Sequence, residues 1–371
     1  MSTLKVDAIR HNSATSDAIT TAADGTCTAR ITGMSGGGEL SHRNKVINGG
    51  MMIHQRGDAS ATGSAAYLSC DRFRTYNGSG AQVAVTKSTD TPDGFSASTK
   101  WDCTTADTSV AASDYFMIQH KIEGQNIQDF AKGTSSAKQF ALSFYIKATK
   151  TGVYTIELED TDNDRACSKT ITVSNTNWNR YSIIYPADTT GAFNNDNGGS
   201  LTISFWLMGG SNYTSGTLQS SAWGARTNAN RVSSSNVNAF DSTSNDFYLT
   251  GVQLEVGDTV TSFEHRSHAE ELELCKRYYQ QVYFYWNTGS TNSNYLYYVG
   301  GQFHPVMRAA PSLVAAYDNN NENSFETRDG GTWRTGLPSL IEAQPEGIVL
   351  RSNNNVVFNA IKGIAHFNAE L

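Results

Sequence analysis

Charged residues are scarce in this chain, and long apolar runs are missing. Asp, Glu, Lys and Arg make up 17% of the 371 residues, well below the quarter that is usual in globular proteins. The net charge is −7 and no dense Lys/Arg run occurs, so the basic face of a nucleic-acid-binding protein is not expected. No apolar run approaches the ~18 residues of a membrane span, so no membrane insertion is expected. The segment MSTLKVDAIRHNSATSD has no apolar core of a signal peptide, so we expect no secretion leader.

Cysteine pairs and enzyme signatures are missing as well. The five cysteines are far apart and include no CxxC pair, so we expect buried, reduced thiols in a chain made in a reducing cytoplasm, and no zinc ribbon. They are Cys27, Cys70, Cys103, Cys167 and Cys275. The sequence contains no HExxH, GxSxG or P-loop motif and no GxGxxG before a helix, so we predict that the protein is not an enzyme.

Alternation of apolar and polar side chains is what the sequence has in abundance. The segment QFALSFYIKA alternates Phe140, Leu142, Phe144 and Ile146 with polar or small residues. SLTISFWLMGG, VYTIELED and FYLTGVQLEV repeat the pattern. A period of two indicates antiparallel strands with one dry face, and Asn/Gly/Asp loops between them are typical of sandwiches. We therefore predict an all-β fold: a jelly-roll β-sandwich with a short N-terminal anchoring segment, one connecting helix and a small C-terminal β domain.

The chain divides into three parts. Residues 1–45 are predicted to form an N-terminal anchoring segment that ends in a Gly-rich linker, and residues 46–266 the sandwich. Residues 267–371 are predicted to be the connecting helix and the C-terminal β domain. Ser267 and Glu270 fit a capping box at the start of that helix. Its apolar stripe is predicted to follow helical spacing through Ala269, Leu272, Cys275 or Lys276, and Tyr279. The polar stretch 224–246 is either a mobile loop or a loop packed across the sandwich.

Exposed aromatic rings are the candidate binding groups, because sugars present both C–H faces and hydroxyls. The candidates are Trp178, Trp206, Trp223, Tyr213 and Trp333. Trp206 alternates away from Leu201 and Leu207, which places it on the less buried face of its strand. The C-terminal part carries a group of tyrosines that suits either receptor contact or subunit packing. These are Tyr283, Tyr285, Tyr295, Tyr297 and Tyr298.

One acidic turn is a candidate cation site. Asp160, Asp162 and Asp164 have the spacing of the first ligands in a calcium loop. The rest of that pattern fails, because Arg165 stands where Gly is needed and Ile171 where Glu is needed. A plain acidic hairpin turn and a structural calcium therefore remain the alternatives, and no other metal or cofactor is predicted.

Several longer stretches resemble proteins of bacteriophage tails. NKVINGGMMIHQRG and YLSCDRFRTY resemble the start of a domain of phage tail fibres and related virion proteins with a carbohydrate-binding-module-like jelly roll. The resemblance continues through residues 130–158, 187–223 and 242–279. STLKVDAIRHNSATSDAIT and HFNAEL resemble the two ends of fibre proteins from marine and cyanobacterial phages. The likeness is specific in the middle of the chain and looser at its ends.

The resemblance implies a tail-fibre subunit located in the phage tail of the virion and made in the host cytoplasm. It implies a homotrimer that attaches to tail or adaptor proteins through its N-terminus and binds a host surface glycan or outer-membrane receptor. Two alternatives stay open: a tailspike enzyme that degrades capsule or lipopolysaccharide, and a tail adaptor or decoration protein without adhesive function. The resemblance brings no agreed set of sugar-contacting residues.

Overall fold

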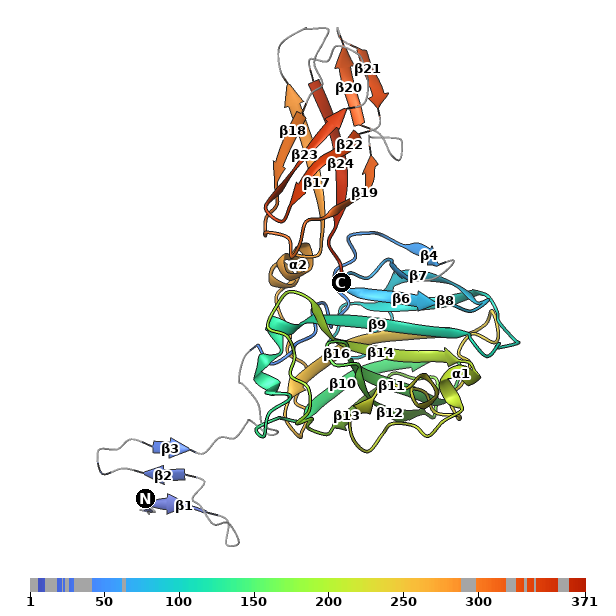
Figure 1. The fold of residues 1–371 in the computed structure, drawn as a ribbon, viewed down its shortest axis with the longest axis vertical. Helices are drawn as coiled ribbons and strands as arrows, with labels where there is room; N and C mark the ends of the chain where they lie inside the picture. The colour runs from blue at the N-terminus through green and yellow to red at the C-terminus, as the bar shows by residue number, and fades with distance from the viewer. Residues whose placement is uncertain are drawn as a thin grey trace.

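Strands dominate the fold of this protein. The computed structural model describes residues 6–10, 19–21, 23, 27–29, 42–61, 65–287, 298–317, 325–329, 332–336, 338–352 and 360–371. Figure 1 shows a sandwich in the middle, a C-terminal β module above it with helix α2 at the junction, and a small N-terminal sheet. The prediction of an all-β, jelly-roll-type sandwich is confirmed. Within the described residues, no helix is both long and apolar enough to cross a membrane.

Two antiparallel sheets make the sandwich. The six-stranded sheet has the order β13-β10-β16-β8-β7-β4. Its strands are β4 (Ala59–Ala61), β7 (Gln82–Ser88), β8 (Ser98–Thr105), β10 (Phe140–Ala148), β13 (Asn179–Tyr185) and β16 (Asp246–Val256). The seven-stranded sheet has the order β15-β12-β11-β14-β9-β6-β5. Its strands are β5 (Ala65–Tyr67), β6 (Phe73–Asn77), β9 (Tyr115–Glu123), β11 (Gly152–Asp160), β12 (Arg165–Val173), β14 (Gly199–Gly209) and β15 (Gly224–Ala225).

The core lies between these sheets and follows the predicted alternation. Four residues of β10 and four of β14 point into it and are fully buried; they are Phe140, Leu142, Phe144, Ile146, Leu201, Ile203, Phe205 and Leu207. Each such side chain contributes roughly 1.5–3 kcal/mol by burial. Four of the five cysteines are free and buried, as expected: Cys70, Cys103, Cys167 and Cys275. The side chain of Cys27 lies outside the described residues.

The outer face of the seven-stranded sheet is more buried than the sequence predicted. The stretch 224–246 crosses this face, where the amide of Val237 bonds to the carbonyl of Val153 at 2.9 Å. The side-chain oxygen of Asn236 accepts a bond from the amide of Thr155 at 2.7 Å. Of the two alternatives for this stretch, the structure therefore shows the packed one. Short helical turns accompany it and the neighbouring loops: η1 (Gly124–Asn126), η2 (Gln128–Phe130), α1 (Ser211–Thr214) and η3 (Asn228–Asn230).

Helix α2 (His268–Lys276) connects the sandwich to the C-terminal module. As predicted, the Ser267 hydroxyl caps it and accepts a bond from the amide of Glu270 at 3.2 Å. The predicted apolar stripe is confirmed in part, because Cys275 and Tyr279 are buried. Ala269 is exposed and Leu272 half-exposed, and the helix buries Glu271 in addition. The Glu271 carboxylate is accommodated because it accepts bonds from the amide of Asn48 and from the guanidinium of Arg266.

The remaining strands form one N-terminal sheet and two C-terminal sheets. The N-terminal sheet contains β1 (Ala8–Ile9), β2 (Ile19–Thr21) and β3 (Cys27–Ala29). The larger C-terminal sheet contains β17 (Tyr279–Asn287), β19 (Ser312–Tyr317), β20 (Phe325–Asp329), β21 (Thr332–Gly336) and β24 (Ala360–Asn368). The smaller one contains β18 (Tyr298–Gln302), β22 (Pro338–Gln344) and β23 (Gly347–Ser352).

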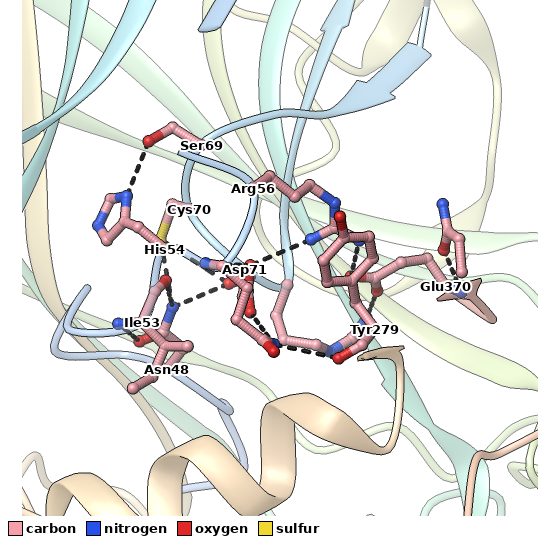
Figure 2. A network of polar contacts seen from close by, with 12 residues as sticks. Asn48, Ile53, His54, Arg56, Ser69, Cys70, Asp71, Tyr279 and Glu370 are labelled. Carbon is pink, nitrogen blue, oxygen red and sulfur yellow. Dashed lines mark hydrogen bonds and ion pairs between the residues drawn. The ribbon is translucent and has the colours of Figure 1, made fainter. Parts of the chain in front are cut away.

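A buried polar network fastens the C-terminal module to the sandwich (Figure 2). The Arg56 guanidinium lies 3.1 Å from Asp71 in the sandwich and 3.2 Å from Glu370 near the end of the chain. It also lies over the Tyr279 ring, 3.7 Å from the ring centre. Arg72 makes a second ion pair with Glu370. Because these groups are almost fully buried, the loss of one partner would leave an uncompensated charge.

Candidate functional site

Two of the predicted binding aromatics are buried. Trp206 is fully buried, and its indole nitrogen donates a bond to Glu157 at 3.0 Å. The prediction that it lies on an accessible face is wrong, because the packed stretch 224–246 covers that face and places Arg231 over the ring. Trp223 is 6% exposed and donates to the carbonyl of Pro186 at 2.8 Å. Neither indole ring offers a face to a ligand.

The other candidates lie apart from one another. Tyr213 is half-buried and packs against Trp206 and Tyr115, with ring centres 5.3 and 5.8 Å apart. Trp333 belongs to β21, and its side chain lies outside the described residues. Trp178 is half-exposed, directly precedes β13 and lies at the outer face of the six-stranded sheet. The structure therefore does not bring the predicted residues together, and among the candidates whose side chains it describes Trp178 is the accessible indole.

Trp178 belongs to a mixed aromatic and charged patch. Its indole nitrogen donates a bond to Asp90 Oδ1 at 2.8 Å. Its ring meets that of Tyr248 nearly edge-on, with centres 6.1 Å apart and planes at 69°. The amines of Lys100 and Lys147 lie 5.7 and 5.4 Å from the centre of the Tyr248 ring. We call these residues, together with Asp102 and Asp246, the Trp178–Tyr248 patch.

A bulge in β16 explains why Tyr248 faces outward. The buried residues Val252 and Leu254 set an alternation that would place Tyr248 inside. The pairing of β16 with β10 shifts between two positions: Ser143 is opposite Gln253, and Tyr145 is opposite Thr250. One residue of β10 therefore faces two residues of β16, which is a β-bulge. Gly251, with φ of +62°, lies in that bulge. The sequence analysis missed Tyr248 and both lysines; the glycine inside a strand was the available signal.

Opposite charges surround the Tyr248 ring. The hydrogen bond from Lys147 holds the pKa of Asp90 below its ordinary value. Lys100 lies 3.1 Å from Asp246 and 3.5 Å from Asp102. Burial and the hydrogen bond with Asp102 raise the pKa of Asp246. Burial alone would lower the pKa of Lys100, but the Asp246 carboxylate outweighs it and the pKa is raised.

The aromatic surface continues beside this patch. Tyr145 is diagonal to Tyr248 across β10 and β16, because Lys147 is opposite Tyr248 and Thr250 is opposite Tyr145. The Phe95 ring packs on Tyr145 with centres 5.2 Å apart. It also lies 5.0 Å from the Phe263 ring. The outer face of the six-stranded sheet thus carries a strip of half-buried rings with charged groups at one end.

The acidic turn carries a lysine in place of a metal. The Asp160 carboxylate accepts a bond from the buried Lys132 amine. The same amine lies 2.9 and 2.7 Å from the carbonyl oxygens of Thr190 and Gly191. It also lies 3.0 Å from Asp188. These oxygens are of the type that a calcium ion would take, but an ammonium group occupies their centre.

The other two carboxylates of the turn face different partners. Asp162 accepts bonds from the amide and side chain of Asn194 at 2.9 and 3.1 Å. Asp164 pairs with Arg226 at 2.6 Å. Among the described residues, no group of three or more His, Cys, Asp or Glu side chains is placed to hold a metal. The arrangement favours the plain acidic turn over the calcium site.

Comparisons with known proteins give a weak structural likeness. No family model matches the sequence, and no curated protein matches it. The enzymatically active domain of bacteriophage CBA120 tailspike protein 4 is similar over 57% of this chain, with 13% identity and a TM-score of 0.28, and the match spans 21% of that protein. A family 4 carbohydrate-binding module is similar over 57% of this chain and 99% of its own, with 12% identity and a TM-score of 0.30.

A third similar structure is the module TmCBM61 in complex with β-1,4-galactotriose. It is 10% identical, with a TM-score of 0.30, over 58% of this chain and 99% of its own. At these scores the likeness assigns no function. What the chain binds has to be argued from its own side chains.

Proposed function

We propose that this protein is an adhesive virion subunit of a phage tail, which binds a host surface glycan through the Trp178–Tyr248 patch. The observation that carries the proposal is an accessible indole held by a hydrogen bond to Asp90, beside Tyr248 and the two lysines around it. Ring faces suit the C–H surfaces of a sugar. Carboxylates and amines suit its hydroxyl groups.

The virion role is supported by the resemblance of residues 44–57, 67–76 and 130–158 to phage tail-fibre proteins. In this proposal residues 1–45 attach the subunit to the tail or to an adaptor protein, and the subunit is a homotrimer. Three weak sites on one particle gain about 10²–10⁴ in avidity. Shallow single sites are therefore sufficient for firm attachment to a cell.

We propose binding without catalysis, because the paired carboxylates are poorly placed for glycosidase chemistry. A glycosidase needs two carboxyl groups ~5–10 Å apart on either side of its substrate. Glu157 is fully buried and held by Arg231, so it has no access to a sugar. Asp102 and Asp246 are opposite each other across β8 and β16, and both lie close to the Lys100 amine, at 3.5 and 3.1 Å, which leaves no space for a substrate between them.

The test measures binding and cleavage with the same protein. We expect the purified full chain to bind polysaccharide extracted from host cells in affinity electrophoresis, to release no new reducing ends, and to compete with phage for adsorption. Release of reducing ends in proportion to protein would favour the tailspike enzyme. Absence of polysaccharide binding together with absence of competition would favour the adaptor or decoration role. Either result would overturn the proposal.

A further inference from the structure

Two cations without an ion-pair partner lie together on the outer face of the seven-stranded sheet. Arg74 of β6 is opposite Gln119 of β9, and Lys121 is the next outward residue along β9. Both side chains are half-buried. Within the part of the chain that the structure describes, neither amine nor guanidinium makes a hydrogen bond or an ion pair; Arg74 instead lies over the Tyr76 ring, 4.6 Å from its centre. The charged groups of Arg74 and Lys121 therefore have hydrogen-bond donors that an anion could accept from.

Three carboxylates of this region are already occupied, among them Glu159, which acts on Lys121. Glu159 makes ion pairs with Arg226 at 3.0 Å and with Arg231 at 2.9 Å. Glu370 pairs with Arg56 and Arg72, and Glu123 pairs with Arg277 at 3.0 Å. These neighbouring arginines therefore all have carboxylate partners, in contrast to Arg74 and Lys121. In a chain of net charge −7, two adjacent unpaired cations need an explanation.

Burial makes the arrangement costly in the absence of a ligand. Burial lowers the pKa of Lys121 and the charge of Arg74 lowers it further, and together they outweigh the Glu159 carboxylate, which raises it. Like charges close to each other in a partly dry site destabilise each other. An anion placed between them would remove this repulsion and would accept charge-assisted hydrogen bonds from both.

Aromatic rings begin next to the two cations. The Tyr76 ring lies 4.9 Å from the Tyr115 ring, which in turn lies 5.8 Å from the Tyr213 ring. The three tyrosines are half-buried. A ligand with a planar anionic group and a ring therefore matches this surface better than a free inorganic anion does, because a carboxylate fits the guanidinium fork and a sugar ring fits the tyrosines.

We propose that Lys121 and Arg74 form a second binding site, which takes the carboxylate of an acidic sugar residue whose ring packs on Tyr76 and Tyr115. This site lies on the sheet opposite to the one that carries the Trp178–Tyr248 patch, so it goes beyond the function proposed above and does not depend on it. A chain with both sites binds a neutral or mixed saccharide on one face and an acidic one on the other.

The test uses tetragalacturonate, its methyl ester and inorganic phosphate as probes in calorimetric titrations of the full chain at low salt. We expect binding of tetragalacturonate, no binding of the ester, which lacks the charge, and weaker binding of phosphate. Lys121→Met should lower the affinity for tetragalacturonate about ten- to hundredfold. Lys121→Arg should restore much of it. Lys138→Met, which replaces an exposed lysine elsewhere, and Trp178→Ala should leave it unchanged.

Three results would overturn the second site. They are equal affinity for the acid and its ester, phosphate binding without tetragalacturonate binding, and unchanged affinity in Lys121→Met. Thermal unfolding of each variant checks that it is folded. As an independent readout, bound tetragalacturonate should protect Lys121 from acetylation in peptide mass spectrometry, whereas Lys138 should be acetylated equally with and without it.

Discussion

The indole nitrogen of Trp178 and Oδ1 of Asp90 lie 2.8 Å apart, joined by a hydrogen bond between two loops at the outer face of the six-stranded sheet. The second oxygen of Asp90 pairs with Lys147 of β10. Because Trp178 is half-exposed, neighbouring side chains cover its ring only in part. The bond to Asp90 therefore helps to hold the ring in this orientation.

Substitution of Asp90 tests this orientation directly. Asp90→Ala removes the acceptor for the Trp178 indole, and we expect glycan affinity to fall about three- to tenfold because the ring must be ordered on binding. Asp90→Asn keeps an oxygen acceptor and should lose less. Since Asp90 is on the surface, either change should alter the free energy of unfolding by no more than ~1 kcal/mol. Titration calorimetry and urea unfolding measure both effects; equal losses in the two variants would contradict this role.

A Gly251→Ala substitution tests the bulge that turns Tyr248 outward. A Cβ atom at Gly251 would lie 2.8 Å from ring atoms of both Phe95 and Tyr145, and φ there is +62°. Gly94 is a matched control, with φ of +88° and no atom within 4 Å of its Cβ position. We expect Gly94→Ala to cost ~1–2 kcal/mol for backbone strain. Gly251→Ala should cost ~1–3 kcal/mol more from overpacking. Equal losses in urea unfolding would show that the bulge is not tightly packed.

The buried pair of Arg231 and Glu157 gives a prediction for stability. Arg231 donates to both oxygens of Glu157 at 2.8 and 2.7 Å and to Glu159 at 2.9 Å. Arg231→Met leaves the Glu157 carboxylate buried without its counter-charge, and we expect a loss of ~3–5 kcal/mol. The double variant Arg231→Met with Glu157→Gln should recover more than half of the lost stability, because the glutamine amide oxygen still accepts the Trp206 N–H. A double-mutant cycle measures the coupling energy between Arg231 and Glu157. Additive losses in the two single variants would contradict a coupled pair.

His54 makes part of the stability depend on pH. Its ring nitrogens lie 2.8 Å from the Ser69 hydroxyl and 3.0 Å from the Met51 carbonyl. Burial lowers the pKa of His54 to about 4. Between the ordinary pKa of His, about 6.5, and the lower pKa of the folded state, the unfolded chain binds the proton more readily than the folded chain. The stability that depends on neutral His54 is therefore lost as the pH falls through this range. Burial raises the pKa of Asp71 to about 6, which acts in the opposite direction.

A comparison of variants isolates the effect of His54. The difference in free energy of unfolding between wild type and His54→Gln should shrink by roughly 2 kcal/mol from pH 7.5 to pH 4.5. Asp71 is present in both proteins and cancels in this difference. A difference that is constant with pH would contradict a neutral, buried His54.

The buried faces of the sandwich were predictable from the sequence, whereas the outer face that carries the Trp178–Tyr248 patch was not. Alternation placed Phe144 and Phe205 in the core because strand periodicity is local. It failed for Trp206, since the burial of that ring depends on a segment more than twenty positions away in the chain, which carries Arg231. It also missed Tyr248, because a single extra residue at Gly251 reverses the alternation.

Helix α2 at the end of the sandwich shows the same difference: features that depend on sequence neighbours were predictable, and those that depend on distant residues were not. The cap by Ser267 was predictable, because it depends on neighbours in sequence. Burial of Glu271 was not, because its partner Asn48 comes from a distant loop. The domain boundaries, the trimer and the location in the virion remain predictions from the sequence.

The most direct test of the glycan site compares Trp178→Ala with Tyr283→Ala in titrations against host polysaccharide fragments. Tyr283 is 64% exposed on the C-terminal module and is therefore a matched control for an exposed aromatic ring. We predict that Trp178→Ala lowers the affinity at least about tenfold, as expected for the loss of a central aromatic contact, and that Tyr283→Ala leaves it unchanged. Full affinity in Trp178→Ala with a loss in Tyr283→Ala would contradict the proposed site and move receptor contact to the C-terminal module.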